Sequence, residues 1–178
     1  MIFEETKLKG SFIVDMKRIE DDRGFFARGW CPQEFKEHGL NPRVAQFNVA
    51  FNPRQGTLRG MHFQREPHAE AKFVRCTRGA LFDVMIDLRP DSPTHGQWVG
   101  VELTEDNHRG LYIPEGFAHG YQTLTPDCEM YYFTTHTYSK ESAGGVRFDD
   151  PAFGVEWPEP VTLISEVDRN WPGCEPVN

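Results

Sequence analysis

The segment Ala80-Leu81-Phe82-Asp83-Val84-Met85-Ile86-Asp87 decides the fold of this 178-residue chain. Phe82, Val84 and Ile86 alternate with Asp83 and Asp87, so the apolar and the acidic side chains point to opposite faces of an extended segment. Alternation of this kind is typical of a β-strand with one face in the core and the other in water. The sequence therefore predicts a half-buried strand over residues 80–87.

Similar short apolar segments lie on both sides of this strand, and turn residues such as Arg78-Gly79 and Asp91-Ser92-Pro93 separate them. Strands are predicted at residues 11–15, 43–49, 58–63, 72–77, 97–103, 110–113, 118–124 and 129–135. Only residues 32–38 predict a helix, because Pro32 stands at its start and Gly39 follows its end. We expect one domain over residues 1–178, an all-β jelly-roll barrel with short peripheral helices.

Composition limits the function of the chain. It has 27 acidic and 19 basic residues, a net charge of -8 and no block of like charge, which argues against a surface for nucleic acid or anionic membranes. An anionic ligand must therefore be met by locally placed Arg and Lys. Cys31, Cys76, Cys128 and Cys174 form no C-x-x-C pair, so free thiols and a cytoplasmic location are expected. No apolar run approaches the roughly 20 residues that a membrane span needs.

Two spaced motifs resemble the metal-binding motifs of cupins. Gly56, followed after five residues by His62-Phe63-Gln64, resembles the start of the first motif, and Pro114-Glu115-Gly116-Phe117-Ala118-His119 resembles the second. In metal-binding cupins, as the resemblance implies, a second histidine stands where this chain has Gln64. An amide oxygen is a poor transition-metal ligand, and two histidines alone do not complete a stable site. We therefore expect no metal and no cofactor, with His62 and His119 free for acid–base work or binding.

Arg59 and His62 stand three residues apart on one predicted strand, so in a regular strand they would point to opposite faces. A bulge at Gly60 would turn both toward the barrel interior, and we predict that bulge. A carboxylate on the far nitrogen of His62 would fix its tautomer, and Asp168 is the candidate partner.

Five runs in order along the chain resemble the dTDP-4-dehydrorhamnose 3,5-epimerase family over about residues 12–172. They are Asp22-Arg23-Gly24-Phe25-Phe26, Leu58-Arg59-Gly60-Met61-His62-Phe63-Gln64, Phe82-Asp83-Val84, Ile113-Pro114-Glu115-Gly116-Phe117-Ala118-His119-Gly120 and Arg147-Phe148-Asp149-Asp150-Pro151. The resemblance implies a metal-free, dimeric cupin jelly roll that acts on nucleotide-linked 4-keto-6-deoxyhexoses. It also implies an isomerase that inverts C3 and C5 through enolate intermediates.

The resemblance assigns roles to individual residues. His62 resembles the general base that removes the proton next to the ketone, with Asp168 as its orienting carboxylate. Tyr132 matches the acid that returns a proton on the opposite face, and Lys72 would stabilise the enolate. The expected substrate-binding residues, for the sugar, the diphosphate and the base, are Arg23, Phe26, Gln46, Asn48, Arg59, His119 and Tyr138.

The chain departs from the family pattern in its recognition residues. Arg28, Ala143 and Val167 stand where the family usually has a glutamate, a second glutamate, and a lysine or arginine, and the connection from Asn48 to Arg59 is one residue longer. These changes leave open a C3-only epimerase, or an epimerase of another sugar on CDP or GDP, including a heptose.

Other interpretations also stay open. A single histidine on a strand often has a structural role, Lys72 and Arg59 could be surface charges, and Tyr138 could be rim packing. A non-catalytic sugar-binding cupin and a metal-dependent dioxygenase remain as competing classes.

Overall fold

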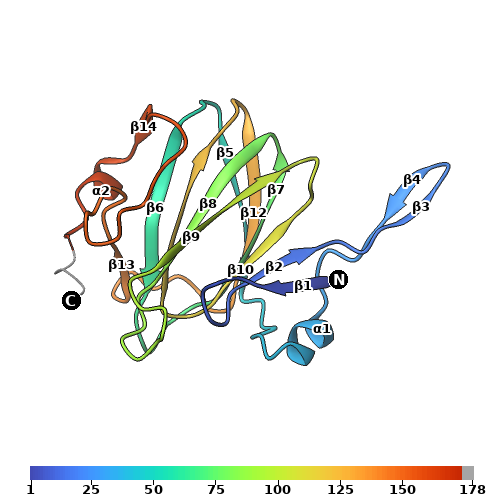
Figure 1. Ribbon diagram of the computed structural model, residues 1–178, viewed down its shortest axis with the longest axis horizontal. Coiled ribbons are helices and arrows are strands. Elements are labelled where there is room, and N and C mark those ends of the chain that lie inside the picture. Colours follow the sequence, from blue (N-terminus) through green and yellow to red (C-terminus); the bar gives the residue numbers. More distant parts are fainter. Residues whose placement is uncertain (174–178) are drawn as a thin grey trace.

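The computed structural model describes residues 1–173 and consists mainly of two facing β-sheets (Figure 1). The first sheet has the order β1 (Ile2–Glu5), β2 (Phe12–Asp15), β10 (Gly110–Ile113), β7 (Lys72–Arg78), β12 (Cys128–Thr134), β5 (Gln46–Asn52). The second has the order β13 (Ala143–Gly145), β6 (Thr57–Gln64), β11 (Phe117–Thr123), β8 (Ala80–Asp87), β9 (Trp98–Thr104), with β14 (Leu163–Ile164) paired to β6 in parallel.

The elements outside the sheets are short. Helix α1 (Pro32–Glu37) covers the outer face of the first sheet through Phe35, and α2 (Glu166–Arg169) lies beside β6. Strands β3 (Ile19–Asp21) and β4 (Gly24–Phe26) form a hairpin that extends away from the sandwich (Figure 1). The all-β jelly-roll prediction with short peripheral helices is therefore confirmed. The sequence did not predict β1, β3, β4, β13, β14 or α2.

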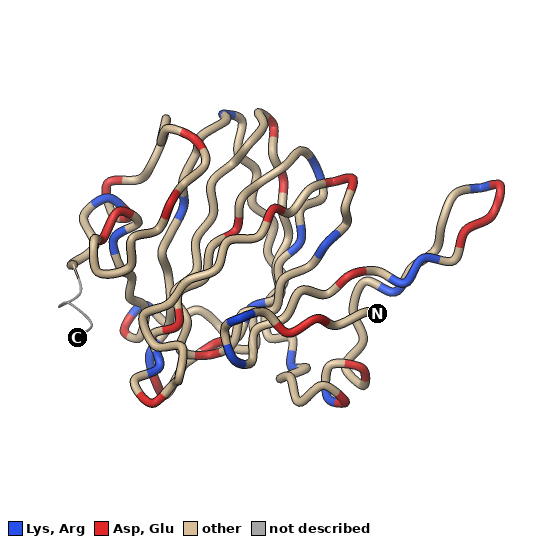
Figure 2. Tube along the Cα trace, viewed as in Figure 1, with Lys and Arg blue, Asp and Glu red and all other residues tan. Residues whose placement is uncertain are grey.

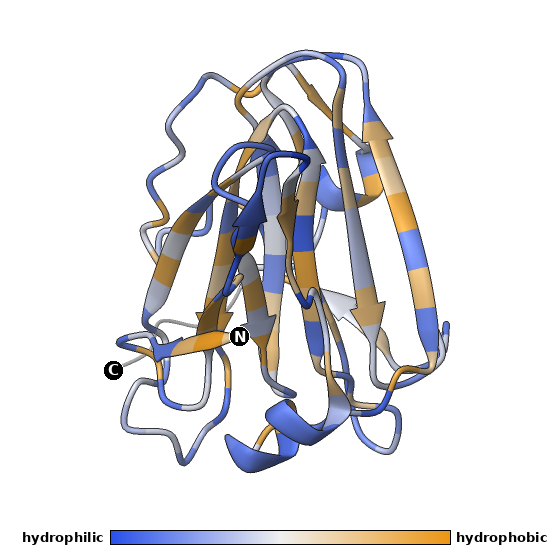
Figure 3. Cartoon of the chain, turned by 90° about the vertical axis from the view of Figure 1, so that its right-hand side faces the viewer, coloured by the Kyte–Doolittle hydropathy of each residue, from blue (hydrophilic) through white to orange (hydrophobic). Residues whose placement is uncertain are grey.

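The core lies on more than one side of the sheets. Leu81 and Met85 of β8 pack between the two sheets, whereas Val84 and Ile86 pack on the outer face against a cluster that includes Phe153. Figure 3 shows the resulting alternation of apolar and polar residues along the strands.

The prediction that β8 is half-buried is wrong, because Asp83 and Asp87 are both 0% exposed. The acidic side chains point inward, and the opposite, apolar face is covered by the later chain segment around Phe153 and Trp157. A strand covered on both faces cannot be recognised from its own alternation. Asp87 is satisfied by Arg89, Ser92 and Thr94.

The predicted bulge at Gly60 is confirmed. His119 of β11 is opposite His62, and Tyr121 is opposite Arg59, so β6 carries one more residue than β11 between the two pairs. Gly60 has φ +135, and a Cβ at this position would lie 2.5 Å from the Cα of Gly120. The close approach of β11 therefore requires glycine.

No helix of the described residues is long and apolar enough to cross a membrane.

Candidate functional site

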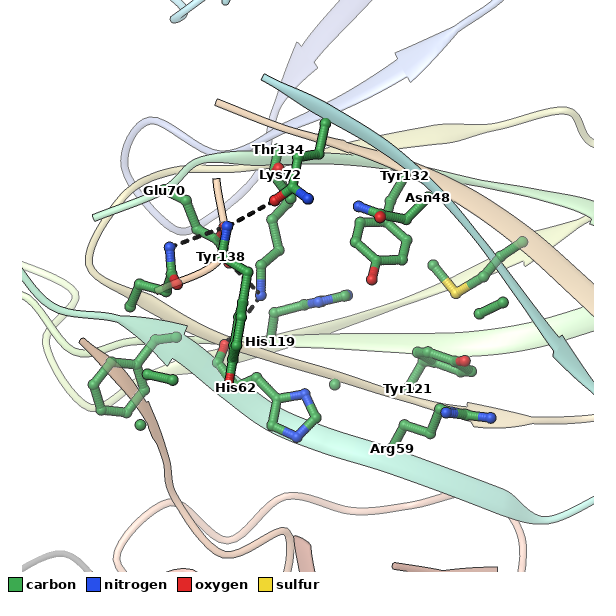
Figure 4. A pocket seen from close by; sticks show the side chains of 18 of the residues that line it. Asn48, Arg59, His62, Glu70, Lys72, His119, Tyr121, Tyr132, Thr134 and Tyr138 are labelled. Carbon is green, nitrogen blue, oxygen red and sulfur yellow. Dashed lines mark hydrogen bonds and ion pairs between the residues drawn. The ribbon is translucent and has the colours of Figure 1, made fainter. Parts of the chain in front are cut away.

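A cavity of about 480 Å³ opens between the two sheets. Its walls come from β5, β7 and β12 on one side and β6 and β11 on the other (Figure 4). Eight of the residues expected at the site line this cavity: Gln46, Asn48, Arg59, His62, Lys72, His119, Tyr132 and Tyr138.

His62 is held from behind by Asp168. The Nε2 atom of His62 lies 2.6 Å from Oδ1 of Asp168, and the backbone N–H of Gly60 donates to Oδ2 of the same carboxylate. Burial raises the pKa of Asp168, but the hydrogen bonds from His62 and Gly60 outweigh it and the pKa is lowered overall. Asp168 therefore stays ionised and fixes the His62 ring through Nε2, which leaves Nδ1 as the nitrogen able to take a proton.

Asp168 lies in the first turn of α2, which begins at Glu166. Ser165 caps the helix by accepting a hydrogen bond from the backbone N–H of Asp168. The Trp171 ring that follows α2 packs edge-on to His62, with ring centroids 6.2 Å apart. The His62–Asp168 pair is thus held in place by the C-terminal segment as well as by β6.

His119 forms a second histidine–carboxylate pair in the same cavity. Its Nε2 lies 3.0 Å from Oδ2 of Asp83, which is fully buried. Burial raises the pKa of Asp83, and His119 and Lys72 oppose this shift. Within residues 1–173, no group of three or more His, Cys, Asp or Glu side chains is arranged to hold a metal ion.

Lys72 lies in the cavity wall with carboxylates on two sides. Its Nζ is 3.4 Å from Glu70, donates to the carbonyl of His62, and also interacts electrostatically with Asp83. Burial lowers the pKa of Lys72, while Glu70 and Asp83 counteract the shift. The ammonium is thus placed beside His62 and largely shielded from water.

Tyr132 faces the cavity from β12, on the sheet opposite to His62, next to Asn48 of β5 (Figure 4). Burial and the nearby Glu70 raise the pKa of Tyr132, so its phenol stays protonated. A protonated phenol and an imidazole on facing walls are suited to moving protons on opposite faces of a bound molecule.

Gln64 and Gln46 organise the cavity rim. The backbone N–H of Ser139 donates to Oε1 of Gln64, whose Nε2 donates to the His68 carbonyl and to Glu70. Gln46 Oε1 accepts from the backbone N–H of Tyr138. Gln64, which replaces the cupin histidine, therefore anchors two rim loops, and Tyr138 is held by its backbone while its ring remains exposed.

Arg23 and Phe26 lie outside the cavity, on the β3–β4 hairpin. Arg23 is paired with Asp21 in that hairpin, and Phe26 is 73% exposed. Figure 2 shows charged residues of both signs along the hairpin. The two residues are therefore not brought together with the other site residues within one chain.

The departures from the family pattern fall in two places. Ala143 and Val167 line the cavity, as uncharged residues where the family pattern has charged ones. Arg28 lies elsewhere and is paired with Glu34, which also binds the N-terminal ammonium.

The sequence analysis did not identify five residues of the site: Asn52, Glu70, Asp83, Tyr121 and Trp171. For Glu70 a signal exists, since it stands two residues before Lys72 and so shares its face in an extended segment. For Asn52 no local signal exists.

The chain is similar to known proteins over nearly its whole length. The family model for dTDP-4-dehydrorhamnose 3,5-epimerase matches residues 5–175. The dTDP-4-dehydrorhamnose 3,5-epimerase of Methanothermobacter thermautotrophicus is 43% identical, over 95% of this chain and 92% of the relative. The crystal structure of the corresponding epimerase from Bacillus anthracis, with TDP and PPi bound, has a TM-score of 0.93 and 36% identity, over 97% of this chain and 99% of that one.

A relative that is named for epimerisation at C3 alone also matches. The dTDP-4-dehydrorhamnose 3-epimerase of Streptomyces niveus is 35% identical, over 92% of this chain and 79% of the relative. From its family match and from these similarities, the chain belongs to the dTDP-4-dehydrorhamnose 3,5-epimerase family.

Proposed function

We propose that the protein inverts C3 and C5 of a dTDP-linked 4-keto-6-deoxyhexose, giving the dTDP-4-dehydrorhamnose configuration. One observation carries the proposal: His62 on one sheet, paired with Asp168 of α2, faces Tyr132 on the other sheet across a cavity lined by Lys72. Inversion at carbon requires that a proton leave one face and arrive at the other, and this arrangement supplies both groups.

The proposed chemistry has two half-reactions at each centre. Nδ1 of His62 takes the proton next to the C4 ketone, and the electron pair of the broken C–H bond forms an enolate. Lys72 stabilises the negative oxygen, because a cation in a site shielded from water interacts strongly with developing charge. Tyr132 then donates its proton to the carbon from the opposite face, and solvent restores both side chains.

Substrate binding is assigned to the remaining cavity residues. Lys72, His62 and His119 each have a carboxylate partner, whereas Arg59 makes no ion pair with any described residue. Arg59 is therefore the group that we expect to meet the diphosphate. His119 and Asn48 would contact the sugar, and the exposed Tyr138 would stack on the base.

We also propose a homodimer in which the β3–β4 hairpin completes the cavity of a second copy. Phe47, Val49 and Phe51 are exposed on the outer face of β5, at the open edge of the first sheet. An exposed apolar edge strand is normally covered. Arg23 and Phe26 can act as ligands only if the hairpin reaches a neighbouring subunit. Analytical ultracentrifugation tests this: a monomer at micromolar concentration would refute it.

A second candidate is epimerisation at C3 alone, or on another nucleotide. It is favoured by Ala143 and Val167, which line the cavity where the family pattern has charged residues, and by the similarity to a 3-epimerase. Incubating the enzyme in deuterated water with dTDP-, CDP- and GDP-linked 4-keto sugars, including a heptose, discriminates these candidates by mass spectrometry. Two deuterons support the 3,5-epimerase and one supports the C3-only enzyme.

Exchange, binding and metal measurements together separate the competing classes. Binding of a nucleotide sugar without exchange would identify a non-catalytic sugar-binding cupin. Stoichiometric iron in the purified protein, with activity lost on chelation, would identify a metal-dependent dioxygenase and refute the metal-free mechanism. A cytoplasmic location stays a prediction from the sequence.

A further inference from the structure

The side chains of Asn52 and Arg59 connect the two sheets at the edge of the cavity. Asn52 is the last residue of β5 in the first sheet, and Arg59 lies on β6 in the second. The Nε–H of Arg59 donates to Oδ1 of Asn52 at 2.8 Å. The turn over residues 53–56 joins the two strands, in the connection that is one residue longer than the family pattern.

Asn52 has its own orientation fixed. It is 1% exposed, and its Nδ2 donates to the hydroxyl of Tyr121 at 3.2 Å and to the carbonyl of Cys128 at 3.4 Å. A buried amide that is bonded at both ends cannot rotate without leaving polar atoms unpaired. Asn52 is therefore a rigid acceptor for Arg59.

The contact determines which part of Arg59 remains for a ligand. Its Nε is used by Asn52, and its two Nη groups make no hydrogen bond to any described residue. Arg59 lines the cavity, and its guanidinium lies beside Tyr121 (Figure 4). Two Nη groups presented end-on match two oxygens of a phosphate. Without the bond from Nε, the long side chain could adopt many rotamers, and each binding event would have to order it.

We infer that Asn52 is a positioning residue that presents the Nη groups of Arg59 to the diphosphate of the substrate. The inference rests on the proposed function only for the nature of the ligand, a nucleoside diphosphate. Because Asn52 acts on Arg59 and not on His62, its removal weakens binding and leaves the proton-transfer step intact.

A double-mutant cycle tests this role. The probe is the tightest binder among dTDP, CDP and GDP, measured by calorimetry with wild type, Asn52→Ala, Arg59→Lys and the double variant. Asn52→Ala alone weakens binding about tenfold, the cost of about one hydrogen bond to a charged group. In the Arg59→Lys background, where no Nε–H exists, Asn52→Ala changes binding by less than about twofold.

Arg65→Lys is the matched control background, because Arg65 lies over Phe63 at the rim and does not contact Asn52. There, Asn52→Ala keeps its full effect. At saturating substrate, the rate of hydrogen exchange in Asn52→Ala stays within about twofold of wild type, so KM changes and kcat does not. Melting temperatures are measured for every variant, and Asn52→Ser replaces Asn52→Ala if that protein does not fold.

Additive effects of Asn52→Ala and Arg59→Lys would overturn the inference, as would loss of the effect in the Arg65→Lys control or failure of wild type to bind any of the three nucleotides. The proposed function fails separately. Non-additivity with no hydrogen exchange would refute the epimerase and support the role of Asn52. Hydrogen exchange together with additive effects of the two substitutions would support the epimerase and refute the role of Asn52.

Discussion

His62 and His119 lie opposite each other on the neighbouring antiparallel strands β6 and β11, and each binds a carboxylate through Nε2. The two pairs differ in access to solvent: the side chain of His62 is 44% exposed, whereas that of His119 is 9% exposed. His62 is thus the more accessible imidazole for proton exchange with solvent, and His119 is suited to fixed hydrogen bonding with a bound sugar.

The carboxylate of Asp168 is predicted to matter for the chemical step more than for binding. Asp168→Asn loses the negative charge that stabilises protonated His62, so kcat should fall about 100-fold or more while the Kd for the nucleotide sugar changes little. Steady-state kinetics and calorimetry measure the two quantities. Retention of most of the wild-type kcat would show that another group orients the base.

Tyr132→Phe is predicted to separate proton removal from proton return. The variant keeps His62 and Lys72, so hydrogen exchange at C3 survives, but the epimerised product falls strongly because no phenol donates on the opposite face. Tyr131→Phe is the matched control: Tyr131 lies next to Tyr132 on β12 and interacts electrostatically with Arg75 instead of lining the cavity. Equal losses of product in the two variants would contradict the assignment.

The alkaline limit of activity is predicted to report Lys72. Burial lowers the pKa of Lys72 from the ordinary 10.5. As the pH rises, the ammonium therefore loses its charge earlier than an exposed lysine would, and the enolate loses its partner. Lys72→Arg keeps a charge that does not titrate in this range, so the alkaline limb of the kcat profile should move to higher pH even if the rate is lower. An unchanged limb would assign it to a different group.

Asp87 is predicted to contribute to acid stability. Burial raises its pKa, but hydrogen bonds from Arg89, Ser92 and Thr94 outweigh this and lower the pKa to about 2 from the ordinary 3.8. A lowered carboxylate pKa stabilises the fold fully above about pH 4, by about 2 kcal/mol, and this is lost as the pH falls through about 2. Asp87→Asn should therefore be less stable at pH 7, and the difference should shrink towards pH 2.

Urea unfolding at several pH values measures this effect. A difference between wild type and Asp87→Asn that does not depend on pH would contradict the origin in a shifted pKa.

Most strands, and the inward orientation of both Arg59 and His62 on β6, could be predicted because they depend on local sequence. Alternation marks β8, and the three-residue spacing of Arg59 and His62 around a glycine indicates the bulge. The burial of Asp83 could not be predicted, because Asp83 points inward to His119, while a distant segment around Phe153 covers the opposite, apolar face of β8. Short strands such as β13 contain too few residues to show a period.

The site was predictable to the extent that its residues resemble a known pattern. Asp83 acts through a contact at 3.0 Å with His119, which is distant in sequence. Asn52 lies 2.8 Å from the nearby Arg59, but its orientation is fixed by Tyr121, which is distant in sequence. Only the folded chain identifies such partners. The same holds for Arg23, whose separation from the cavity depends on the direction of the β3–β4 hairpin.

The most direct test of the central claim is a comparison of wild type and His62→Ala in deuterated water containing a chelator, with dTDP-4-keto-6-deoxyglucose as substrate. The account predicts that wild type incorporates deuterium at C3 and C5, and that His62→Ala incorporates none while it binds the nucleotide sugar with nearly unchanged Kd. Exchange by His62→Ala at the wild-type rate, or no exchange by wild type, would contradict it.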